Sequence, residues 1–516
     1  MAPRRRGFPA LPTSLNVASM RAKSLTTRLF LVVALLGVVL MAVIAYRTAT
    51  FASLQRSVPA TTTIPVDAGV AAQRLAGALV YPTVSHQDRS AIDRAAFTGL
   101  HAYLAERYPR VHQSLRREAV AGLSLLYTWE GADPSLPPVI LMAHQDVVPV
   151  ARDNEQRWQH GPFAGVIADG YVWGRGALDD KLMVLGILEA VEALLTEGYR
   201  PQRTFYLAFG HDEEVGGTGG AAAIVRVLRA RGVTDAALIL DEGLPITTGL
   251  FPGVTGPLAT IGIAEKGYVS LALRVEGEGG HSAMPPPATN IGILAGAVRR
   301  LEEAPFDLRL TEATEHQFRF LGPELSFANR VVLANLWLFE PLFLRRMAAM
   351  PPAAAMLRTT TAATMFNAGV KENVLPAAAS AVVNLRILQD DTVDSVVQRV
   401  REVIDDARIQ IDVLQPANDP SPVSDPRSAA FQFVERTIRE TWNAPDLVVV
   451  PTLVIGGTDS KHYAGLSDNV LRFAPVQVES AADVQRWHGP NERVAIEAYA
   501  DTVRFYQRLI RNLEGL

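Results

Sequence analysis

The stretch LAFGHDEEVGG, residues 207–217, joins an apolar strand to a cluster of acids. The strand run begins at Thr204 and continues directly into Asp212, Glu213 and Glu214, which two glycines follow. Clustered carboxylates on a tight loop raise one another's pKa unless a cation lies among them. A solvated acidic turn would explain this stretch equally well on its own. An apolar strand followed by acidic residues recurs along the chain, however, and this recurrence favours a metal site.

Short apolar runs and helical segments alternate on both sides of this stretch. The runs are SLLYTW (124–129), PPVILMAH (137–144) and DAALILD (235–241), and the helical segments at 180–198 and 218–232 end in glycine. Such alternation predicts an α/β fold with a mostly parallel sheet and helices on both faces. Ligands of open α/β sheets bind where the strands run out into loops.

The pattern changes after Lys266, where two strand–helix units predict a small α+β domain with an open sheet. A histidine of interest, His488, lies beyond this domain, so the chain must return to the first domain to complete a site. We therefore expect a catalytic domain in two parts, 67–266 and 417–516, interrupted by an inserted lid domain, 267–416.

The N-terminus carries an apolar run of 18 residues, from Leu29 to Tyr46. Six basic residues precede it, whereas only Arg47 follows closely, and this asymmetry predicts a cytoplasmic N-terminus. We expect a basic tail (1–28), a single transmembrane anchor (29–46), a linker (47–66) and a catalytic domain on the outer side, periplasmic or extracellular. A cleaved signal peptide is the alternative, although the run is longer than a usual signal segment.

Composition narrows the function further. The net charge of −4 gives no reason to expect a nucleic-acid partner. The chain contains no cysteine, which excludes disulfides and thiolate metal sites. The stretch 306–366 is unusually apolar; it would suit a membrane contact or an acyl pocket, but an extended lid core is the favoured interpretation.

The remaining candidate side chains follow other predicted strands or turns. His144 and Asp146 leave a strand on the same side, which suits a histidine ligand and a carboxylate that orients it. Asp179 precedes a helix that it would also cap. Asp241 and Glu242 end another strand, and His488 lies in a turn. Nitrogen and oxygen donors in this mixture suit zinc, and two adjacent glutamates supply a base beside a ligand.

The order of these motifs resembles one family. The motifs are His-x-Asp, Gly-Arg-Gly-Ala-x-Asp-x-Lys, Asp-Glu-Glu-x-Gly-Gly, Leu-Asp-Glu-Gly, Gly-Gly-His-Ser and Trp-His-Gly-Pro-Asn-Glu. The family is that of the zinc metallopeptidases that include aminoacylase, carboxypeptidase S, acetylornithine deacetylase and succinyl-diaminopimelate desuccinylase. Residues 70–516 look most similar to the carboxypeptidase S and N-fatty-acyl-amino-acid hydrolase branch, because Leu-Asp-Glu-Gly replaces a Glu-Pro-Thr motif.

The resemblance implies a role for each matching residue. Asp179 would bridge two Zn²⁺ ions, with His144 and Asp241 as terminal ligands of one and Glu214 and His488 of the other. Glu213 would be the general base, and Asp146 would orient His144. The choice of Asp241 over Glu242 stays open. A cis peptide between Asp179 and Asp180 is also implied.

The predicted lid carries further implied contacts. His281 would reach the substrate carbonyl once the lid closes, and Asn373 and Arg386 would bind the polar end of the substrate. The loop Gly456, Gly457 and Thr458 would contact the substrate carboxylate. Relatives of the aminoacylase type often dimerise through this lid, so the resemblance allows a homodimer here, although the sequence does not determine the oligomeric state.

The favoured function is hydrolysis of an amide or peptide bond next to a free carboxylate, in a small peptide or an N-acyl amino acid. One alternative is a binding protein that has lost catalysis on the same scaffold. Glu213 and all five implied ligands are present, which argues against it. A hydrolase with one metal or none is a third hypothesis.

Overall fold

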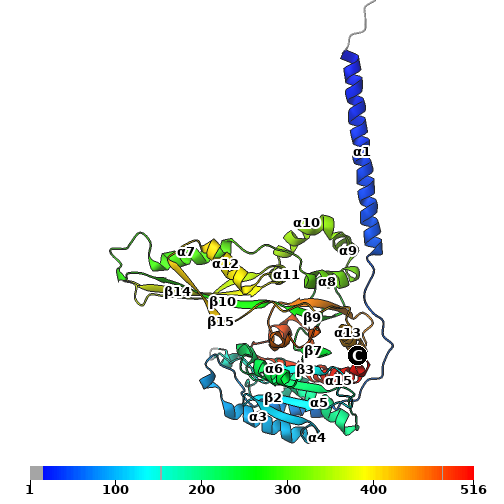
Figure 1. Ribbon diagram of the computed structural model, residues 1–516, viewed down its shortest axis with the longest axis vertical. Helices are drawn as coiled ribbons and strands as arrows, with labels where there is room; N and C mark the ends of the chain where they lie inside the picture. Colours follow the sequence, from blue (N-terminus) through cyan, green and yellow to red (C-terminus); the bar gives the residue numbers. More distant parts are fainter. Residues whose placement is uncertain (1–14, 152–153, 479) are drawn as a thin grey trace, which may run out of the picture.

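The computed structural model describes residues 15–151, 154–478 and 480–516, so residues 1–14 of the basic tail lie outside the described part. A long helix, α1 (Leu15–Thr50), projects from a body that contains two main sheets (Figure 1). The larger sheet is built from chain segments 116–265 and 448–478, and the smaller one from the segment between them, 267–418. The chain therefore leaves the larger sheet and returns to it.

The larger sheet has ten strands and carries the site. Their order is β1 (Arg116–Val120), β2 (Ser124–Trp129), β6 (Phe205–Gly210), β3 (Val139–His144), β7 (Leu238–Asp241), β17 (Val470–Arg472), β9 (Pro257–Glu265), β8 (Ile246–Thr248) and β18 (Gln477–Val478), with β16 (Val448–Val454) beside β9.

This sheet is mixed, which corrects the expectation of a mostly parallel one. Strands β6, β3, β7 and β17 are parallel neighbours, but β1 and β2 form an antiparallel hairpin and β9 runs antiparallel to β8 and β17. The loop of the hairpin has Ala121 and Gly122 at φ 50° and 87°. Two left-handed residues turn the chain back within three positions, so the paired strands must be antiparallel.

Helices cover both faces of the sheet, as predicted. In β3, Leu141 and Ala143 pack into the core beneath α2 (Ala68–Leu79), α5 (Lys181–Thr196) and α15 (Ile496–Asn512). Ile140 and Met142 pack into a second core beneath α6 (Ala221–Ala230). Successive side chains of a strand point to opposite faces, so a continuous apolar run requires a cover on each side.

The smaller sheet has the order β12 (Thr360–Ala368), β14 (Ala378–Ile387), β10 (Gly267–Glu276) and β15 (Ile409–Asn418). Helices α7 (Asn290–Glu303) and α12 (Val393–Ile404) cover one face of it and bury Leu271 and Leu385. Thr289 and Thr392 cap these helices by accepting hydrogen bonds from backbone N–H groups. We call this sheet with its two helices the inserted module.

Four further helices occupy most of the apolar stretch 306–366. They are α8 (Glu312–Leu321), α9 (Phe327–Ala334), α10 (Leu336–Ala348) and α11 (Pro351–Leu357). Phe318, Leu333, Phe343 and Leu357 form a separate small core within them. The four helices lie between the inserted module and the foot of α1 (Figure 1).

The segment between α1 and α2 runs along the larger part of the body. Gln55 exchanges two hydrogen bonds with the backbone of Val449, and the carbonyl of Thr62 accepts one from Arg508.

The remaining α-helices and strands are α3 (Arg94–Arg107), α4 (Pro109–Ser114), α13 (Ala429–Trp442), α14 (Ala481–Val484), a small sheet of β4 (Val166–Ala168), β5 (Tyr171–Trp173) and β19 (Arg493–Ala495), and a pair β11 (Gly280–His281) and β13 (Val374–Leu375).

Candidate active site

Asp179 lies between two histidines. Its Oδ1 is 2.9 Å from His144 Nε2, at the end of β3, and its Oδ2 is 2.9 Å from His488 Nε2, in the turn before β19. Asp179 itself precedes α5, and its peptide bond to Asp180 is cis, as the resemblance implies. The fold therefore brings together side chains that are far apart in the sequence.

Two groups of potential metal ligands share this carboxylate. The first consists of His144, Asp179 and Glu242, and the second of Asp179, Glu214 and His488; the ligand atoms of each group lie within 4.8 Å of one another. Glu242 Oε1 is 3.5 Å from His144 Nε2, and Glu214 Oε2 is 3.3 Å from His488 Nε2. A carboxylate common to two groups suits a pair of cations held close together.

The first group contains Glu242, whereas the resemblance implies Asp241 at this position. Asp241 is the last residue of β7 and Glu242 follows it, and side chains of successive extended residues point in opposite directions. Asp241 is buried, and its carboxylate accepts hydrogen bonds from the N–H groups of Glu242 (2.9 Å) and Ser460 (2.7 Å). Asp241 therefore holds the backbone on which Glu242 stands.

Asp146 joins His144 to the two glutamates. Its Oδ1 accepts a hydrogen bond from the N–H of Glu213 and its Oδ2 one from the N–H of Glu214, both at 3.1 Å. His144 Nδ1 is 3.0 Å from the carbonyl oxygen of Asp146 and 3.4 Å from Oδ1. An Nδ1–H that donates to this carbonyl leaves the Nε2 lone pair for a metal. The backbone carbonyl of Asp146 is thus the hydrogen-bond partner of the histidine, and its carboxylate binds the backbone of the two glutamates.

The carboxylates of the site are buried close to one another. Burial raises the pKa of Glu213 well above its ordinary value, and nearby Asp459 and Glu214 add to this rise while His144 opposes it. Burial likewise raises the pKa of Glu242, with Asp179 and Glu213 contributing. Such a group is stable in its ionised form only when a positive charge is added.

An unpaired carboxylate oxygen of Glu214 also indicates a bound cation. Glu214 Oε1 is buried and has no hydrogen-bond partner within the part of the chain that the structure describes. Buried polar atoms without partners are uncommon in proteins, and a metal ion bound at this oxygen would satisfy it. The residues therefore fit a pair of divalent metal ions, with imidazole nitrogen and carboxylate oxygen as the donors.

Glu492 supports the site, although it is not among the expected site residues. It is fully buried, and its Oε1 accepts hydrogen bonds from the N–H groups of Gly176, Leu178 and Asp179. Its Oε2 pairs with Arg175, whose guanidinium also donates to the carbonyl of His488. The sequence held a signal for this role, because Glu492 is the last residue of the Trp-His-Gly-Pro-Asn-Glu motif that contains His488.

The expected substrate-binding residues separate into two places. Arg386 Nη1 lies 3.8 Å from the position that a β-carbon on Gly457 would occupy, so β14 meets the loop after β16. Gly456 lies in the same loop, and Thr458 anchors it by donating hydrogen bonds to Glu265. The structure thus brings this loop and Arg386 together.

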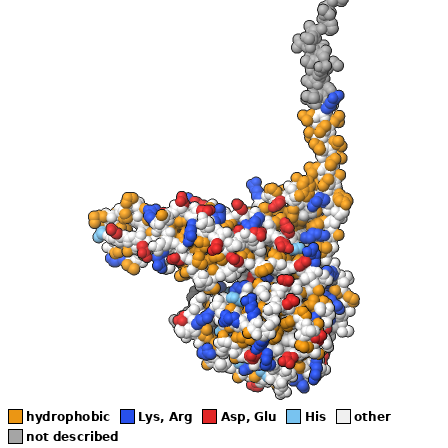
Figure 2. Space-filling view, viewed as in Figure 1, with side chains coloured by type: hydrophobic (Ala, Val, Ile, Leu, Met, Phe, Trp, Pro, Cys, Tyr) orange, Lys and Arg blue, Asp and Glu red, His pale blue; other side chains and the backbone are white. Residues whose placement is uncertain are grey.

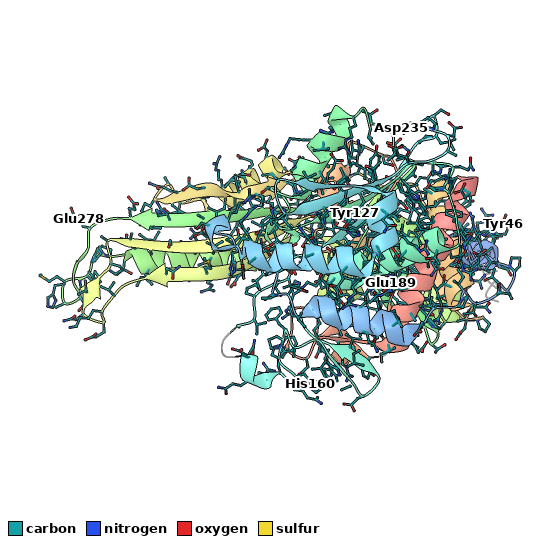
Figure 3. All side chains as sticks on the ribbon, turned by 90° about the horizontal axis from the view of Figure 1, so that it is seen from below. Tyr46, Tyr127, His160, Glu189, Asp235 and Glu278 are labelled. Atoms are coloured by element: carbon teal, nitrogen blue, oxygen red, sulfur yellow. The ribbon has the colours of Figure 1, made fainter. Side chains whose placement is uncertain are left out.

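His281 and Asn373 lie elsewhere. Both are exposed, and the N–H of Ser282 donates to the carbonyl of Asn373 across the β11–β13 pair. Figure 3 shows Glu278, just before this pair, at the end of the inserted module that is far from the larger sheet. Within this chain, neither residue is near the two ligand groups.

Comparison with known proteins identifies the family of the chain. The model of peptidase family M20/M25/M40 matches residues 140–512. The chain belongs to this family. The protein is therefore a metal-dependent peptidase or amidohydrolase.

Individual relatives support the membership in M20. The chain is 43% identical to "Probable carboxypeptidase S-like 2" of Dictyostelium discoideum, over 86% of this chain and 85% of that protein. It is 41% identical to the mouse "N-fatty-acyl-amino acid synthase/hydrolase PM20D1", over 86% and 87%. The expected resemblance to the carboxypeptidase S and N-fatty-acyl-amino-acid hydrolase branch is confirmed.

Solved structures show the same M20 fold. The M20 family metallo-carboxypeptidase Sso-CP2 of Sulfolobus solfataricus superposes with a TM-score of 0.62 at 17% identity, covering 86% of this chain and 98% of that chain. Human carnosine dipeptidase 1 also gives a TM-score of 0.62, at 16% identity, covering 87% and 97%.

Proposed function

We propose that the protein is a membrane-anchored di-zinc hydrolase that cleaves an amide or peptide bond next to a free carboxylate. The observation that carries the proposal is the position of Asp179, which contacts one histidine of each ligand group while Glu213 lies beside both. The alternative of an inactive binding protein has no support among the residues of the site.

The metal-binding residues would be His144, Asp179 and Glu242 for one ion and Asp179, Glu214 and His488 for the other. When bound, the ions supply Lewis-acid polarisation of the scissile carbonyl and a water of lowered pKa. Zinc is the favoured metal because the donors are imidazole and carboxylate groups. A measured content near two zinc ions per chain would agree with this assignment.

Glu213 is the proposed general base. Its carboxylate takes the proton of the attacking water and returns it to the leaving nitrogen. Asp146 fixes the position of Glu213 through the backbone hydrogen bond at 3.1 Å. This contact orients the base without using the side-chain oxygens of Glu213.

His281 is proposed to donate a hydrogen bond to the developing oxyanion. It stands exposed on the inserted module. The histidine therefore has to be delivered, either by closure of the module or from a second copy in a homodimer formed through it. Asn373 would travel with it, because the two residues share the β11–β13 pair.

The substrate class follows from Arg386 and from the relatives. A guanidinium binds a carboxylate through two parallel hydrogen bonds, which fix its orientation as well as its charge. A carboxypeptidase and an N-fatty-acyl-amino acid hydrolase, the activities that the names of the relatives give, both cleave an amide whose nitrogen belongs to an amino acid with a free carboxylate. We therefore assign small peptides or N-acyl amino acids as substrates.

The membrane anchor is also part of the proposal. Residues Thr27–Thr50 of α1 form a helix long and apolar enough to cross a membrane, a property that signal sequences share. The basic residues before it favour an outer location for the body. Protease added to intact spheroplasts should digest residues 60–516; full protection would reverse the topology.

The function is tested with the purified full chain. Its zinc content is measured, and its activity is assayed on dipeptides and N-acyl amino acids, each beside the same compound with an amidated carboxylate. We expect about two zinc ions per chain and preference for the free acids. One ion or none at full activity would contradict the di-zinc assignment, and equal rates on the amides would contradict the substrate class.

A further inference from the structure

Helix α9 and the residue that joins it to α10 contact the foot of α1. The side chain of Asn335, between the two helices, donates to the carbonyl of Ile44 (3.4 Å) and to the hydroxyl of Thr48 (3.2 Å). Arg47 Nε donates to the carbonyl of Ala334 (3.1 Å). These hydrogen bonds fix the height of the α9–α10 junction along α1.

The apolar run of α1 sets that height relative to a bilayer. Its 18 residues, Leu29–Tyr46, extend about 27 Å at 1.5 Å per residue, and the hydrocarbon core is about 30 Å thick. The whole run is therefore needed to cross the core. Ile44 lies within its last turn, so a residue bonded to Ile44 lies at the outer boundary of the hydrocarbon.

The surface of α9 and α10 is suited to that boundary. Phe327, Trp337 and Leu342 expose 76%, 53% and 63% of their surface, although large apolar side chains are usually buried. Figure 2 shows hydrophobic side chains on the body where it meets α1. Tryptophan is enriched at membrane interfaces, where its ring lies at the level of the headgroups.

Along one side of α10, apolar side chains are followed by arginines. Leu338, Leu342, Arg345 and Arg346 follow a spacing of four, three and one positions, which places them on one side of the helix. Both arginines are exposed. Apolar side chains followed by arginines suit a helix that lies in the interface, since the guanidinium groups reach the lipid phosphates.

The two helices do not form a second span. Together they are long and apolar enough to cross a membrane, but the chain bends by 117° between them. A straight crossing is therefore excluded for the conformation described, and a shallow contact remains.

We propose that α9 and α10 form a second membrane contact that lies in the outer leaflet and buries Trp337, Leu338 and Leu342 among the lipids. The occupant of this surface is a lipid bilayer, because the hydrogen bonds to α1 place the surface at bilayer height. The inference rests on the proposed membrane anchor. It implies that the body has a fixed orientation against the bilayer and does not move freely about its connection to α1.

The test uses the absence of cysteine in the chain, which allows single labelling sites. Leu342→Cys, Val38→Cys and Val370→Cys are labelled with a fluorophore in the full chain and placed in phosphatidylcholine vesicles. Val38 lies in α1, and Val370 is 94% exposed on the inserted module. Nitroxide lipids of different depth and aqueous iodide serve as quenchers.

We expect shallow nitroxide lipids to quench the label at 342, deep ones to quench the label at 38, and only iodide to quench the label at 370. Iodide quenching at 342 equal to that at 370, with 38 still quenched by lipid, would overturn the second contact and leave the anchor intact. Shielding of 342 from both quenchers would reveal a protein contact and overturn it as well. Iodide quenching at 38 would instead refute the anchor.

A charge variant provides the second measurement. In a chain labelled at Trp337→Cys, L338E/L342E should raise the iodide quenching constant several-fold toward the value at 370. M365E, which places the same charge on an exposed position of β12, is the matched control and should leave it unchanged. Equal values for both variants would contradict the contact.

Discussion

The guanidinium of Arg386 lies against Gly457. The arginine comes from β14 of the inserted module and the glycine from the loop after β16, so the contact joins the two parts of the body. Gly457 has no side chain to occupy the space in front of Arg386 Nη1. Arg386 stacks on the ring of Tyr268 (4.9 Å to its centre), and none of the salt bridges among the described residues includes it. It is therefore available to an external carboxylate.

Replacing Arg386 by lysine should lower kcat/KM on free-acid substrates roughly ten- to a hundred-fold. The change keeps the positive charge and removes the paired donors, and the loss of a charge-assisted hydrogen bond costs about 1.5–3 kcal/mol. Steady-state kinetics on an N-acyl amino acid measures the effect. On the matching amidated substrate, R386K and wild type should differ little; a loss of the same size there would show that Arg386 acts on something other than the carboxylate.

E213Q should reduce kcat by about 10²–10⁴-fold and leave the metal content unchanged. Glutamine keeps the shape of the side chain but cannot accept the proton of the water. E214Q is the matched control, since it alters the neighbouring proposed ligand and should lower the metal content. Loss of metal in E213Q, with activity restored by added zinc, would make Glu213 a ligand instead of the base.

E242A should lower the metal content from about two ions per chain to about one, since Glu242 is the carboxylate beside His144 in the first ligand group. D241N should retain both ions and weaken their affinity by at most about 10–100-fold, as is usual for residues that position ligands. Dialysis against graded metal buffers followed by elemental analysis separates the two. The opposite pattern would restore Asp241 as the ligand.

Lys266 gives a pH dependence of stability outside the metal-binding groups. Burial lowers its pKa to about 7, with Arg386 adding to the effect, and its Nζ donates to the carbonyls of Ala355 and Arg358. Between pH 7 and 10.5 the unfolded chain binds a proton at this lysine that the folded chain does not bind. The contribution of Lys266 to folding therefore becomes more favourable as pH rises, by at most about 1.4 kcal/mol per pH unit.

K266M should remove this dependence. Its Tm relative to wild type should be highest near pH 6.5 and should fall as the pH approaches 9.5, because only wild type gains stability. The two vacated carbonyls add an offset that does not vary with pH. K371M, which removes an exposed lysine, is the control. A constant difference between K266M and wild type across this range would contradict the lowered pKa.

The sequence indicated the site because its residues follow strands and turns with clear patterns. Apolar runs ending in His144, Asp212 and Asp241 placed polar groups at one edge of the sheet, where parallel strands meet. The choice between Asp241 and Glu242 depends on which side of the strand end faces the histidines, and spacing along one strand does not determine this. Glu492 was overlooked because its role is to accept backbone hydrogen bonds from a distant loop.

The fold, like the site, was predictable in part from the sequence. The helical segments predicted at 180–198 and 218–232 contain α5 and α6, because each combines a regular apolar pattern with a glycine end. The two strand–helix units predicted after Lys266 correspond to β10 with α7 and β14 with α12. Strand direction was not accessible where a short turn reverses the chain, as at Ala121 and Gly122. The path of residues 306–366 was also inaccessible, because a continuous apolar stretch suits a core, a membrane surface and a pocket equally.

The place of β17 in the larger sheet has a consequence for biosynthesis. This strand is among the last to be made, yet it lies between β7 and β9, which precede it by about two hundred residues. Until it emerges, the edge of β7 opposite β3 is unpaired, and an open edge invites association with other chains. The sheet cannot close before nearly the whole polypeptide has left the ribosome, so we expect a nascent or C-terminally truncated chain to be prone to aggregation.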